Sequence, residues 1–353
     1  MNYLFQEQRT SMQKKTTSRD VARAAGVSQS LVSMILNRVP DKKIKAETRA
    51  HVLDIARQMN YTVNVNARNM KNRKAGAIGL LSVWDTGSFV FPPIIKGLQE
   101  ICAENQLGVM ICTGKEDLSG EKDYISYYRQ NRIDALVYLS FVGVSYDGVI
   151  AELENNGIPY VCIIGARDIP GVSCVDVSFL ESGYMACKHM AEMGYGHIAY
   201  LMPDEAERLP YAEKERIDGC RAAMKAAGKE LTEVTRLAGI KEEERLIACA
   251  EELLRSKSFD GFVSCSYGCY ILLKAAVRSG IRIPEEVGVI SLDNEIYAPY
   301  LYPSLTTVDE PLYKMAVSAM SILLKKISGE GTCMKLEIAP SMSVRESTSR
   351  RPG

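Results

Sequence analysis

From residue 75 onward, the chain alternates short apolar runs with longer stretches in which apolar residues recur at helical spacing. The short runs, bounded by turn residues, predict buried strands, and the longer stretches predict helices. Apolar strands that alternate with helices are typical of parallel sheets covered on both faces, and this stretch is long enough to need two such sheets. The expected strands are 77–83, 108–112, 135–139, 160–164, 197–202, 261–265 and 287–292. The expected helices lie near 92–105, 119–131, 147–156, 179–193, 215–227, 242–256, 268–279 and 311–328.

Charge is distributed unevenly along the 353 residues, although 43 basic and 43 acidic side chains give a formal net charge of zero. Residues 1–76 hold fifteen Lys or Arg and five Asp or Glu, and all ten cysteines lie beyond them. Two compositions indicate two modules, and a basic end on a neutral chain is typical of a protein that binds a polyanion. A solvated basic tail would carry the same charge.

Several protein classes are excluded by composition. No apolar run approaches the ~20 residues that a membrane-spanning helix needs, so we expect no membrane partner. Residues 1–15 lack the apolar region of a secretory signal, and the cysteines lack the spacing of a disulfide scaffold. Together these features predict a cytoplasmic protein with reduced thiols.

The basic end has a helical pattern that a solvated tail would lack. A short helix beginning at Ser18 is expected to end at Gly26 in the left-handed conformation. A second helix, capped by Ser28, is expected over 29–37, and a third over 47–60. This order predicts a helix-turn-helix whose second helix can enter a major groove. A three-helix bundle that binds no DNA would show the same pattern.

Short motifs run through both modules. In the basic module they are Asp20-Val21-Ala22-Arg23-Ala24-Ala25-Gly26-Val27-Ser28, Val32-Ser33, Asn37, Glu47-Thr48-Arg49, Asn60-Tyr61, and Asn64 through Ala67-Arg68 to Met70. In the second module they are Ile78-Gly79-Leu80, Gly194-Tyr195-Gly196-His197-Ile198, Ile283-Pro284-Glu285-Glu286-Val287 and Pro303-Ser304-Leu305-Thr306-Thr307-Val308. The colinear set closely resembles the LacI/GalR family of bacterial transcription regulators over about residues 17–346.

The resemblance implies an all-α helix-turn-helix headpiece followed by an α/β effector domain. That domain would consist of two Rossmann-like subdomains joined by three crossovers, as in periplasmic sugar-binding proteins. The expected parts are an N-terminal extension (1–16), the headpiece (17–62), a hinge helix or linker (63–75), the effector-binding and dimerisation domain (76–346) and a tail (347–353). Within the effector domain, the N-subdomain would take about 76–176 and 309–340, and the C-subdomain about 177–308 and 341–346.

In the family, the second helix reads bases and a hinge helix enters the minor groove. The DNA-binding residues implied by this resemblance are Thr17, Ser28, Gln29, Ser30, Ser33, Met34, Asn37, Asn66, Ala67, Arg68 and Met70. Gln29 can bond an adenine edge or a phosphate, and serine hydroxyls suit phosphate oxygens. Met70 would act as the wedge between base steps. The hinge segment, residues 63–75, is too short and too polar to hold a helix without DNA. Alternatively, this segment is an inert linker.

Met34 departs from the family pattern. The family usually has an arginine at this position, which can hold a guanine through two hydrogen bonds. Methionine cannot form those bonds, so we expect an operator that differs from the family consensus at that base pair. Alternatively, Met34 packs on the headpiece.

Four residues carry the expectation of an effector site in the second module. Arg216 and Asp293 match the family's ligand-contacting arginine and aspartate, a pair that suits hydrogen bonding to vicinal hydroxyls. Phe91 and Trp84 are the aromatic candidates for stacking on a sugar or base. Each of the four can instead be a packing residue. A ligand would sit in the cleft at the carboxyl ends of the strands.

At three other places, this sequence has a pair of residues that is smaller or more apolar than the pair that the family usually has. Cys265-Ser266 stands for Asn-Asp, Asp176-Val177 for Asp-Asn, and Ser88-Phe89 for Asn-Pro. The effector can therefore be an unusual sugar or a less hydroxylated metabolite, or the site has lost its ligand.

We expect no catalytic residues, no metal ligands and no cofactor. Residues 264–268 look like a nucleophile elbow, but all three histidines precede Ser266, whereas a hydrolase triad needs one after it. Residues 194–199 fit a dinucleotide pattern, but their glycines precede a strand instead of following one. Cys265 and Cys269 lack a second ligand pair for zinc, and most cysteines fit small buried hydrophobes.

The sequence therefore predicts a ligand-responsive transcription regulator, a repressor of this family. Its partners would be double-stranded operator DNA, a sugar or related metabolite, and a second copy in a homodimer. No heptad-rich helix follows Arg345, so we expect no tail-mediated tetramer. The alternatives are a soluble small-molecule-binding protein without a DNA role, and an activator of the same fold.

Overall fold

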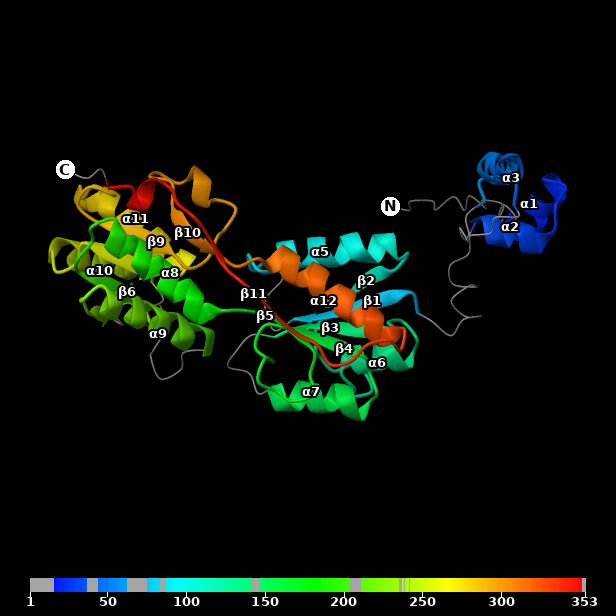
Figure 1. Cartoon of the computed structure of the whole chain (residues 1–353), viewed down its shortest axis with the longest axis horizontal. Helices are drawn as coiled ribbons and strands as arrows, with labels where there is room; N and C mark the ends of the chain where they lie inside the picture. The colour runs from blue at the N-terminus through cyan, green and yellow to red at the C-terminus, as the bar shows by residue number, and fades with distance from the viewer. Residues whose placement is uncertain are drawn as a thin grey trace, which may run out of the picture. The chain divides into compact units, whose positions relative to one another are not determined.

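A computed structural model describes residues 16–36, 44–61, 75–82, 87–140, 146–202, 211–234, 237, 239–240 and 242–350 (Figure 1). The chain divides into two units, residues 1–73 and 74–353. In the part of the chain that is described, no helix is both long and apolar enough to cross a bilayer.

The described residues of the first unit form three helices, as the sequence predicts. They are α1 (Ser18–Ala24), α2 (Gln29–Leu36) and α3 (Ala46–Gln58). Thr17 and Asp20 form a reciprocal capping box at the start of α1. Gly26 has φ +65°, which confirms the expected left-handed end. The helices enclose a small core of Val21, Ala22, Ala25, Val32, Ile35, Val52 and Ala56.

The first sheet of the second unit has the strand order β11-β5-β4-β3-β1-β2, with every neighbouring pair parallel. Its strands are β1 (Ala77–Ser82), β2 (Gly108–Cys112), β3 (Ala135–Leu139), β4 (Tyr160–Ile163), β5 (Cys174–Val177) and β11 (Lys335–Ile338). Successive side chains point to opposite faces, so Val137 and Tyr138 of β3 enter different cores. Helices α5 (Phe91–Glu104) and α12 (Leu312–Ile327) cover the Val137 face, and α6 (Asp123–Arg129) and α7 (Tyr146–Asn155) cover the other (Figure 1).

The second sheet has the order β12-β10-β9-β8-β6-β7 and is parallel except for β12, which runs antiparallel to β10. Its strands are β6 (Ile198–Leu201), β7 (Leu231–Val234), β8 (Gly261–Ser264), β9 (Gly288–Ser291), β10 (Thr306–Asp309) and β12 (Ser341–Ser343). Helices α8 (Phe179–Glu192) and α9 (Tyr211–Ala226) pack on one face, and α10 (Glu243–Arg255) and α11 (Ser266–Ser279) on the other. The described residues also include the 3-10 helices η2 (Ala298–Tyr300) and η3 (Glu346–Thr348).

The chain passes between the two sheets three times. It leaves the first sheet after β5, returns after β10 through α12, and leaves again between β11 and β12. As a result, Asp293 and Glu310 follow the carboxyl ends of β9 and β10. Parallel α/β sheets bind ligands at this edge.

The expected strands and helices are present within a few residues, and the described residues contain five further strands. Three of these, β7, β11 and β12, lie at sheet edges and are partly exposed, so they lack a continuous apolar run. The other two, β5 and β10, are buried but contain polar residues. A short strand that contains polar residues has no continuous apolar run, so hydrophobic patterning does not predict it.

The packed chain extends past residue 346, where the sequence predicts a tail. Ser347 and Thr348 are fully buried. The Thr348 hydroxyl lies 2.8 Å from both His189 Nε2 and Thr306 Oγ1, which ties the end of the described chain to α8 and β10.

Candidate functional site

Helix α2 has one face in the core of the first unit and one face in solvent. Val32 and Ile35 are buried, whereas Ser30 and Ser33 are exposed and Met34 is half-buried. Spacings of three and four residues place side chains on one face of a helix. The predicted base-reading residues of α2 therefore share an accessible face.

Local hydrogen bonds fix the start of this helix. Ser28 Oγ accepts from the Leu31 backbone N at 3.2 Å, which confirms the expected cap, and lies 2.9 Å from Ser30 Oγ. Gln29 Nε2 donates to Ser18 Oγ at 2.9 Å, so the Gln29 side chain bridges α2 to α1. These groups are exposed and keep unused hydrogen-bonding capacity, which suits contacts to phosphates or base edges.

Five basic side chains of the first unit lie in the described residues: Arg19, Arg23, Lys45, Arg49 and Arg57. The other ten of the basic end, among them Arg68 and Lys71, lie outside them. The described helices thus carry only part of the positive charge that predicts a polyanion partner.

In the second unit, Arg216 is held at a close crossing of α8 and α9. A Cβ at Gly183 would lie 1.9 Å from the Arg216 carbonyl oxygen, so only glycine allows this approach. Arg216 is 5% exposed, and its guanidinium carbon lies 5.2 Å from the centre of the Phe179 ring. This cation–π contact and the helix crossing together fix its position.

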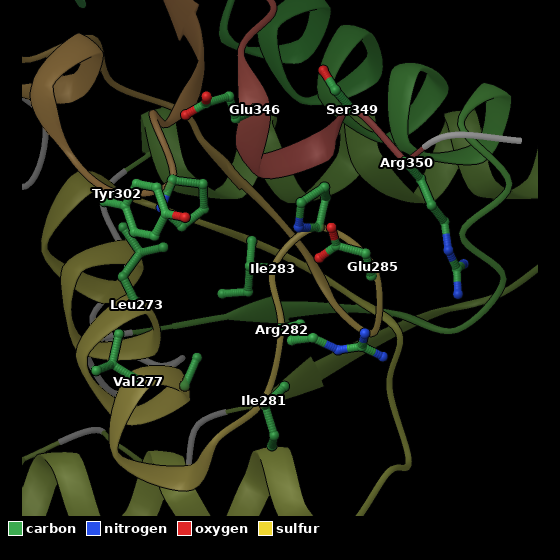
Figure 2. A pocket seen from close by; sticks show the side chains of 13 residues that line it. Leu273, Val277, Ile281, Arg282, Ile283, Glu285, Tyr302, Glu346, Ser349 and Arg350 are labelled. Atoms are coloured by element: carbon green, nitrogen blue, oxygen red, sulfur yellow. The ribbon is translucent and has the colours of Figure 1, made fainter.

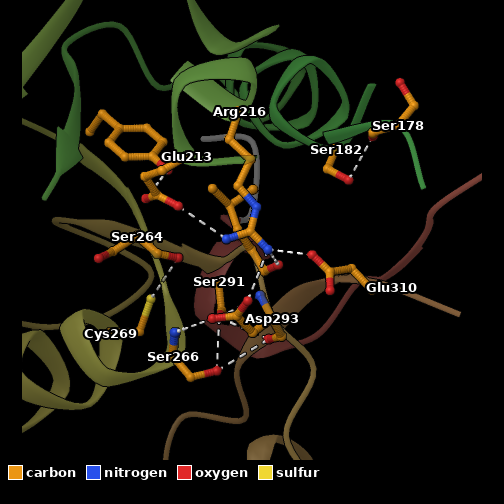
Figure 3. A network of polar contacts seen from close by, with 12 residues as sticks. Ser178, Ser182, Glu213, Arg216, Ser264, Ser266, Cys269, Ser291, Asp293 and Glu310 are labelled. Carbon is orange, nitrogen blue, oxygen red and sulfur yellow. Dashed lines mark hydrogen bonds and ion pairs between the residues drawn. The ribbon is translucent and has the colours of Figure 1, made fainter. Parts of the chain in front are cut away.

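Three carboxylates surround this guanidinium (Figure 3). Arg216 Nη1 donates to Glu213 Oε2 at 3.2 Å, and Nη2 donates to Asp293 Oδ1 at 3.0 Å and to a Glu310 oxygen. All three acidic side chains are largely buried. Elements far apart in sequence thus converge on one buried charge network, which we call the Arg216 network.

Buried hydroxyls extend the network beyond Asp293. Ser266 donates its backbone N–H to Asp293 Oδ2 at 3.0 Å, and Ser291 Oγ donates to the Asp293 carbonyl at 2.8 Å. Ser266 is 2% exposed and bonds within the protein (Figure 3). Ser266 therefore holds the Asp293 carboxylate in place through its backbone N–H and does not face a ligand.

The network is incomplete within the described residues. Arg216 Nε and Glu215 Oε2 are buried and have no hydrogen-bond partner there. Burial raises the pKa of Glu310 to about 7, and Asp293 adds to the rise against the lowering by Arg216. A buried acid with a displaced pKa beside a buried arginine makes the network a candidate binding site.

A separate hollow of about 1060 Å³ lies on the other edge of the second sheet (Figure 2). Its lining comes from α11, from the segments that precede β9 and β10, and from residues 346–350, and it includes Val277, Ile283 and Tyr302. The Arg216 network lies after these strands, at the edge where parallel sheets bind ligands. We therefore place the candidate effector site at the network and not in this hollow.

Two family models match the chain. The model of bacterial regulatory proteins of the lacI family matches residues 17–64, and that of the periplasmic binding protein-like domain matches residues 187–348. The chain therefore carries a lacI-family DNA-binding region followed by a periplasmic binding protein-like domain. The first match covers the capped helices of the headpiece, and the second contains the Arg216 network.

Curated LacI-type relatives match over nearly the full length. The HTH-type transcriptional regulator DegA of Bacillus subtilis is 29% identical over 95% of this chain and 98% of its own. The HTH-type transcriptional repressor PurR of Photobacterium profundum is 25% identical over 94% and 98%. A crystal structure of the lac repressor dimer bound to operator and the anti-inducer ONPF has the same fold, with a TM-score of 0.72 at 17% identity over 95% and 99%. This chain is a DNA-binding transcription regulator.

The structure brings some of the predicted site residues together, whereas others are not in contact or lie outside the described residues. Arg216 and Asp293 form a direct ion pair. Phe91 begins α5 and is 5% exposed in the core of the first sheet, so it has a packing role and its effector contact stays a prediction. The predicted residues that lie outside the described part of the chain are Asn37, Asn66, Ala67, Arg68, Met70 and Trp84.

Sequence reasoning missed Glu213 and Glu310. A signal existed for each: Glu213 lies three residues before Arg216 on the same helix, and Glu310 directly follows a strand. That strand, β10, was not expected, so its carboxyl end could not be used to find the residue.

Seven of the ten cysteines are buried, as the sequence predicts for small hydrophobes. Burial raises the pKa of Cys102 to about 11 and that of Cys112 to about 12. These thiols stay protonated at neutral pH.

Proposed function

We propose that this protein is a LacI-family repressor that binds a near-palindromic operator as a homodimer and responds to a small molecule. The observation that carries the proposal is α2, which buries Val32 and Ile35 and presents Ser30, Ser33 and Met34 to the outside. A helix held in this way can lie in a major groove. As a bacterial regulator, the protein would act in the cytoplasm on nucleoid DNA.

Base reading is assigned to the accessible face of α2. Gln29 and Ser33 offer hydrogen bonds to base edges or phosphates, and Thr17 at the α1 cap is exposed for a phosphate contact. Met34 offers only apolar contact, so guanine is not favoured at its base pair. Asn37, Asn66, Ala67, Arg68 and Met70 keep their predicted roles from the sequence alone.

Small-molecule control is assigned to the Arg216 network. It lies at the carboxyl ends of β9 and β10, beside the connection into α12 that leads back to the first sheet. A ligand there would contact groups near a crossover between the subdomains. If it binds one arrangement of the subdomains better than another, it shifts the population of the DNA-binding state.

Pairing of two copies is supported by exposed apolar side chains around η2. Ile296, Tyr297 and Tyr300 are 77%, 65% and 83% exposed. Large apolar residues gathered in this way favour a protein–protein interface. A symmetric dimer would present two headpieces to the two halves of a palindrome.

A gel shift with the DNA upstream of the protein's own gene tests the proposal. We expect a specific complex that survives excess unrelated competitor DNA. The affinity should fall steeply with salt, with a log–log slope near −0.9 per phosphate neutralised. Binding that competitor DNA removes completely would contradict the regulator function.

A further inference from the structure

A loop at the carboxyl end of β4 in the first sheet has an unusual backbone conformation. It spans residues 164–169, and it begins with Ile164 and Gly165, whose φ angles are +66° and +78°. A β-branched residue rarely adopts a positive φ, so surrounding contacts must hold it there. Ile164 is fully buried, and its carbonyl oxygen accepts a hydrogen bond from Ser140 Oγ. The loop therefore leaves the sheet in a fixed direction.

The two strands from which the chain leaves the first sheet both hold this loop. Asp176 of β5 and Glu337 of β11 are register partners, and each is the last residue but one of its strand. Asp176 Oδ2 accepts from the Gly165 backbone N at 2.9 Å. Arg167 Nη1 donates to Glu337 Oε2 at 3.0 Å. The loop is therefore fixed to the strands that precede the first and third crossovers.

Arg167 also contacts a helix of the other subdomain. Its Nη2 donates to Glu215 Oε1 at 2.6 Å, and Glu215 lies in α9, which packs on the second sheet. Near the start of α9, Ala212 is buried in the core beside the first sheet, so the two subdomains are in contact here. The planar guanidinium thus joins a crossover strand of one subdomain to a helix of the other, a geometry that suits arginine.

The exposure of these side chains limits what the bridge contributes. The side chains of Arg167, Glu215 and Glu337 are 31%, 23% and 48% exposed. An ion pair with this exposure changes an equilibrium constant by about fivefold at most. Such a change matters little for folding, but it is large enough to alter the populations of two subdomain arrangements.

We infer that Arg167 is a latch between the two subdomains, which stabilises the arrangement seen in this structure. Any arrangement that moves α9 away from the loop breaks the Arg167–Glu215 pair, whereas the Arg167–Glu337 pair lies within the first subdomain and is kept. An interaction made in only one arrangement shifts the equilibrium toward that arrangement. Operator affinity therefore depends on the latch, and this consequence rests on the proposed function.

Amide hydrogen exchange of the full chain tests the latch directly. Arg167→Met removes both ends of the bridge, and Glu215→Gln weakens only the end on α9. We expect both variants to speed exchange over residues 212–217 by about two- to fivefold, because the start of α9 then separates more often from the loop. Unchanged exchange over these residues in both variants would overturn the inference.

Arg278→Met is the matched control for the loss of a bridging arginine. Arg278 also joins two carboxylates, those of Glu244 and Glu251, but all three residues belong to helices on the second sheet. Its loss should leave exchange over residues 212–217 at the wild-type rate. Equally fast exchange in Arg278→Met would show a general loosening of the protein and refute a specific latch.

Gel shifts with the same proteins test the consequence for DNA binding. Arg167→Met and Glu215→Gln should change the operator Kd in the same direction, each by about two- to fivefold, because both break the same contact. The double variant should change the Kd by less than the product of the two single factors. Opposite directions, independent effects or wild-type affinity in both single variants would contradict the latch.

The two measurements separate the latch from the regulator function. If the wild type shows no specific DNA binding, the proposed function fails, and hydrogen exchange alone decides whether Arg167 joins the subdomains. If specific DNA binding is present but exchange over residues 212–217 does not respond to either variant, the regulator function stands and the latch is wrong.

Discussion

Gly183 of α8 lies against the backbone of Arg216 in α9, so closely that a Cβ at position 183 would meet the Arg216 carbonyl oxygen at 1.9 Å. Gly219 makes the equivalent approach, with its Cβ position 1.9 Å from the Leu180 carbonyl oxygen. The two helices therefore cross in backbone contact. This crossing sets where the Arg216 side chain begins and how far it reaches toward Asp293.

We expect Gly183→Ala to destabilise the protein and to displace Arg216. The added methyl group meets backbone atoms that cannot rotate away, so overpacking should lower the free energy of unfolding by about 2 kcal/mol or more. Urea unfolding measures this loss. Gly148→Ala is the matched control, because Gly148 lies in α7 with no atom within 4 Å of its Cβ position. It should be neutral or stabilising by up to about 1 kcal/mol, and similar losses in both variants would contradict the close crossing.

Arg216→Met should be strongly destabilising because it leaves three carboxylates without their cation. Removing one partner of a buried ion pair costs about 3–5 kcal/mol. Adding Glu310→Gln to this variant should recover part of the loss, since one of the unpaired charges is then removed.

Arg221→Met is the control on the same helix. Arg221 pairs with Asp218 and Glu233, but its side chain is 53% exposed, so its loss should cost under ~1 kcal/mol. Denaturant unfolding at pH 7 compares the variants. A double variant that is no more stable than Arg216→Met would show that the carboxylates do not repel one another.

Glu310 should make the protein less stable as the pH rises. Burial raises its pKa from 4.5 to about 7, so the folded state binds this proton more tightly than the unfolded state. Its contribution is fully present below about pH 4.5 and is lost by about pH 7, an effect on the order of 3 kcal/mol. Unfolding between pH 5 and pH 8 should therefore be less pH-dependent in Glu310→Gln than in the wild type. Glu330→Gln makes the same change on the surface and should keep the wild-type profile, and identical profiles in all three proteins would rule out a buried titrating Glu310.

The sheets and most helices could be predicted because buried strands and helices have a clear pattern of apolar residues. Strand β3 is apolar throughout, since both of its faces are covered. Strand β11 was not predicted, because it lies at the edge of the first sheet and is mostly exposed, so it lacks an apolar run. Helix α6 is shorter than predicted because Asp117 holds a turn before it, accepting from the Ser119 backbone N at 2.8 Å.

The candidate site could be predicted only in part. Arg216 and Asp293 match family positions, and the structure places them in contact. Neither residue type nor spacing showed that Glu310 would meet the same guanidinium, because that contact depends on which strands are neighbours. The grouping of three carboxylates around one guanidinium therefore appears only in three dimensions.

Met34→Arg should change which operator the protein selects. Met34 lies on the accessible face of α2 and offers no hydrogen bond, whereas arginine can hold a guanine in a bidentate contact worth about 1–3 kcal/mol of discrimination. Selection from a random DNA library should give a guanine at one base pair of each half-site for the variant and not for the wild type. Ala50→Arg adds the same charge on α3 and should strengthen binding to all sequences without changing base preference. If Met34→Arg also strengthens binding uniformly, then Met34 does not face a base pair.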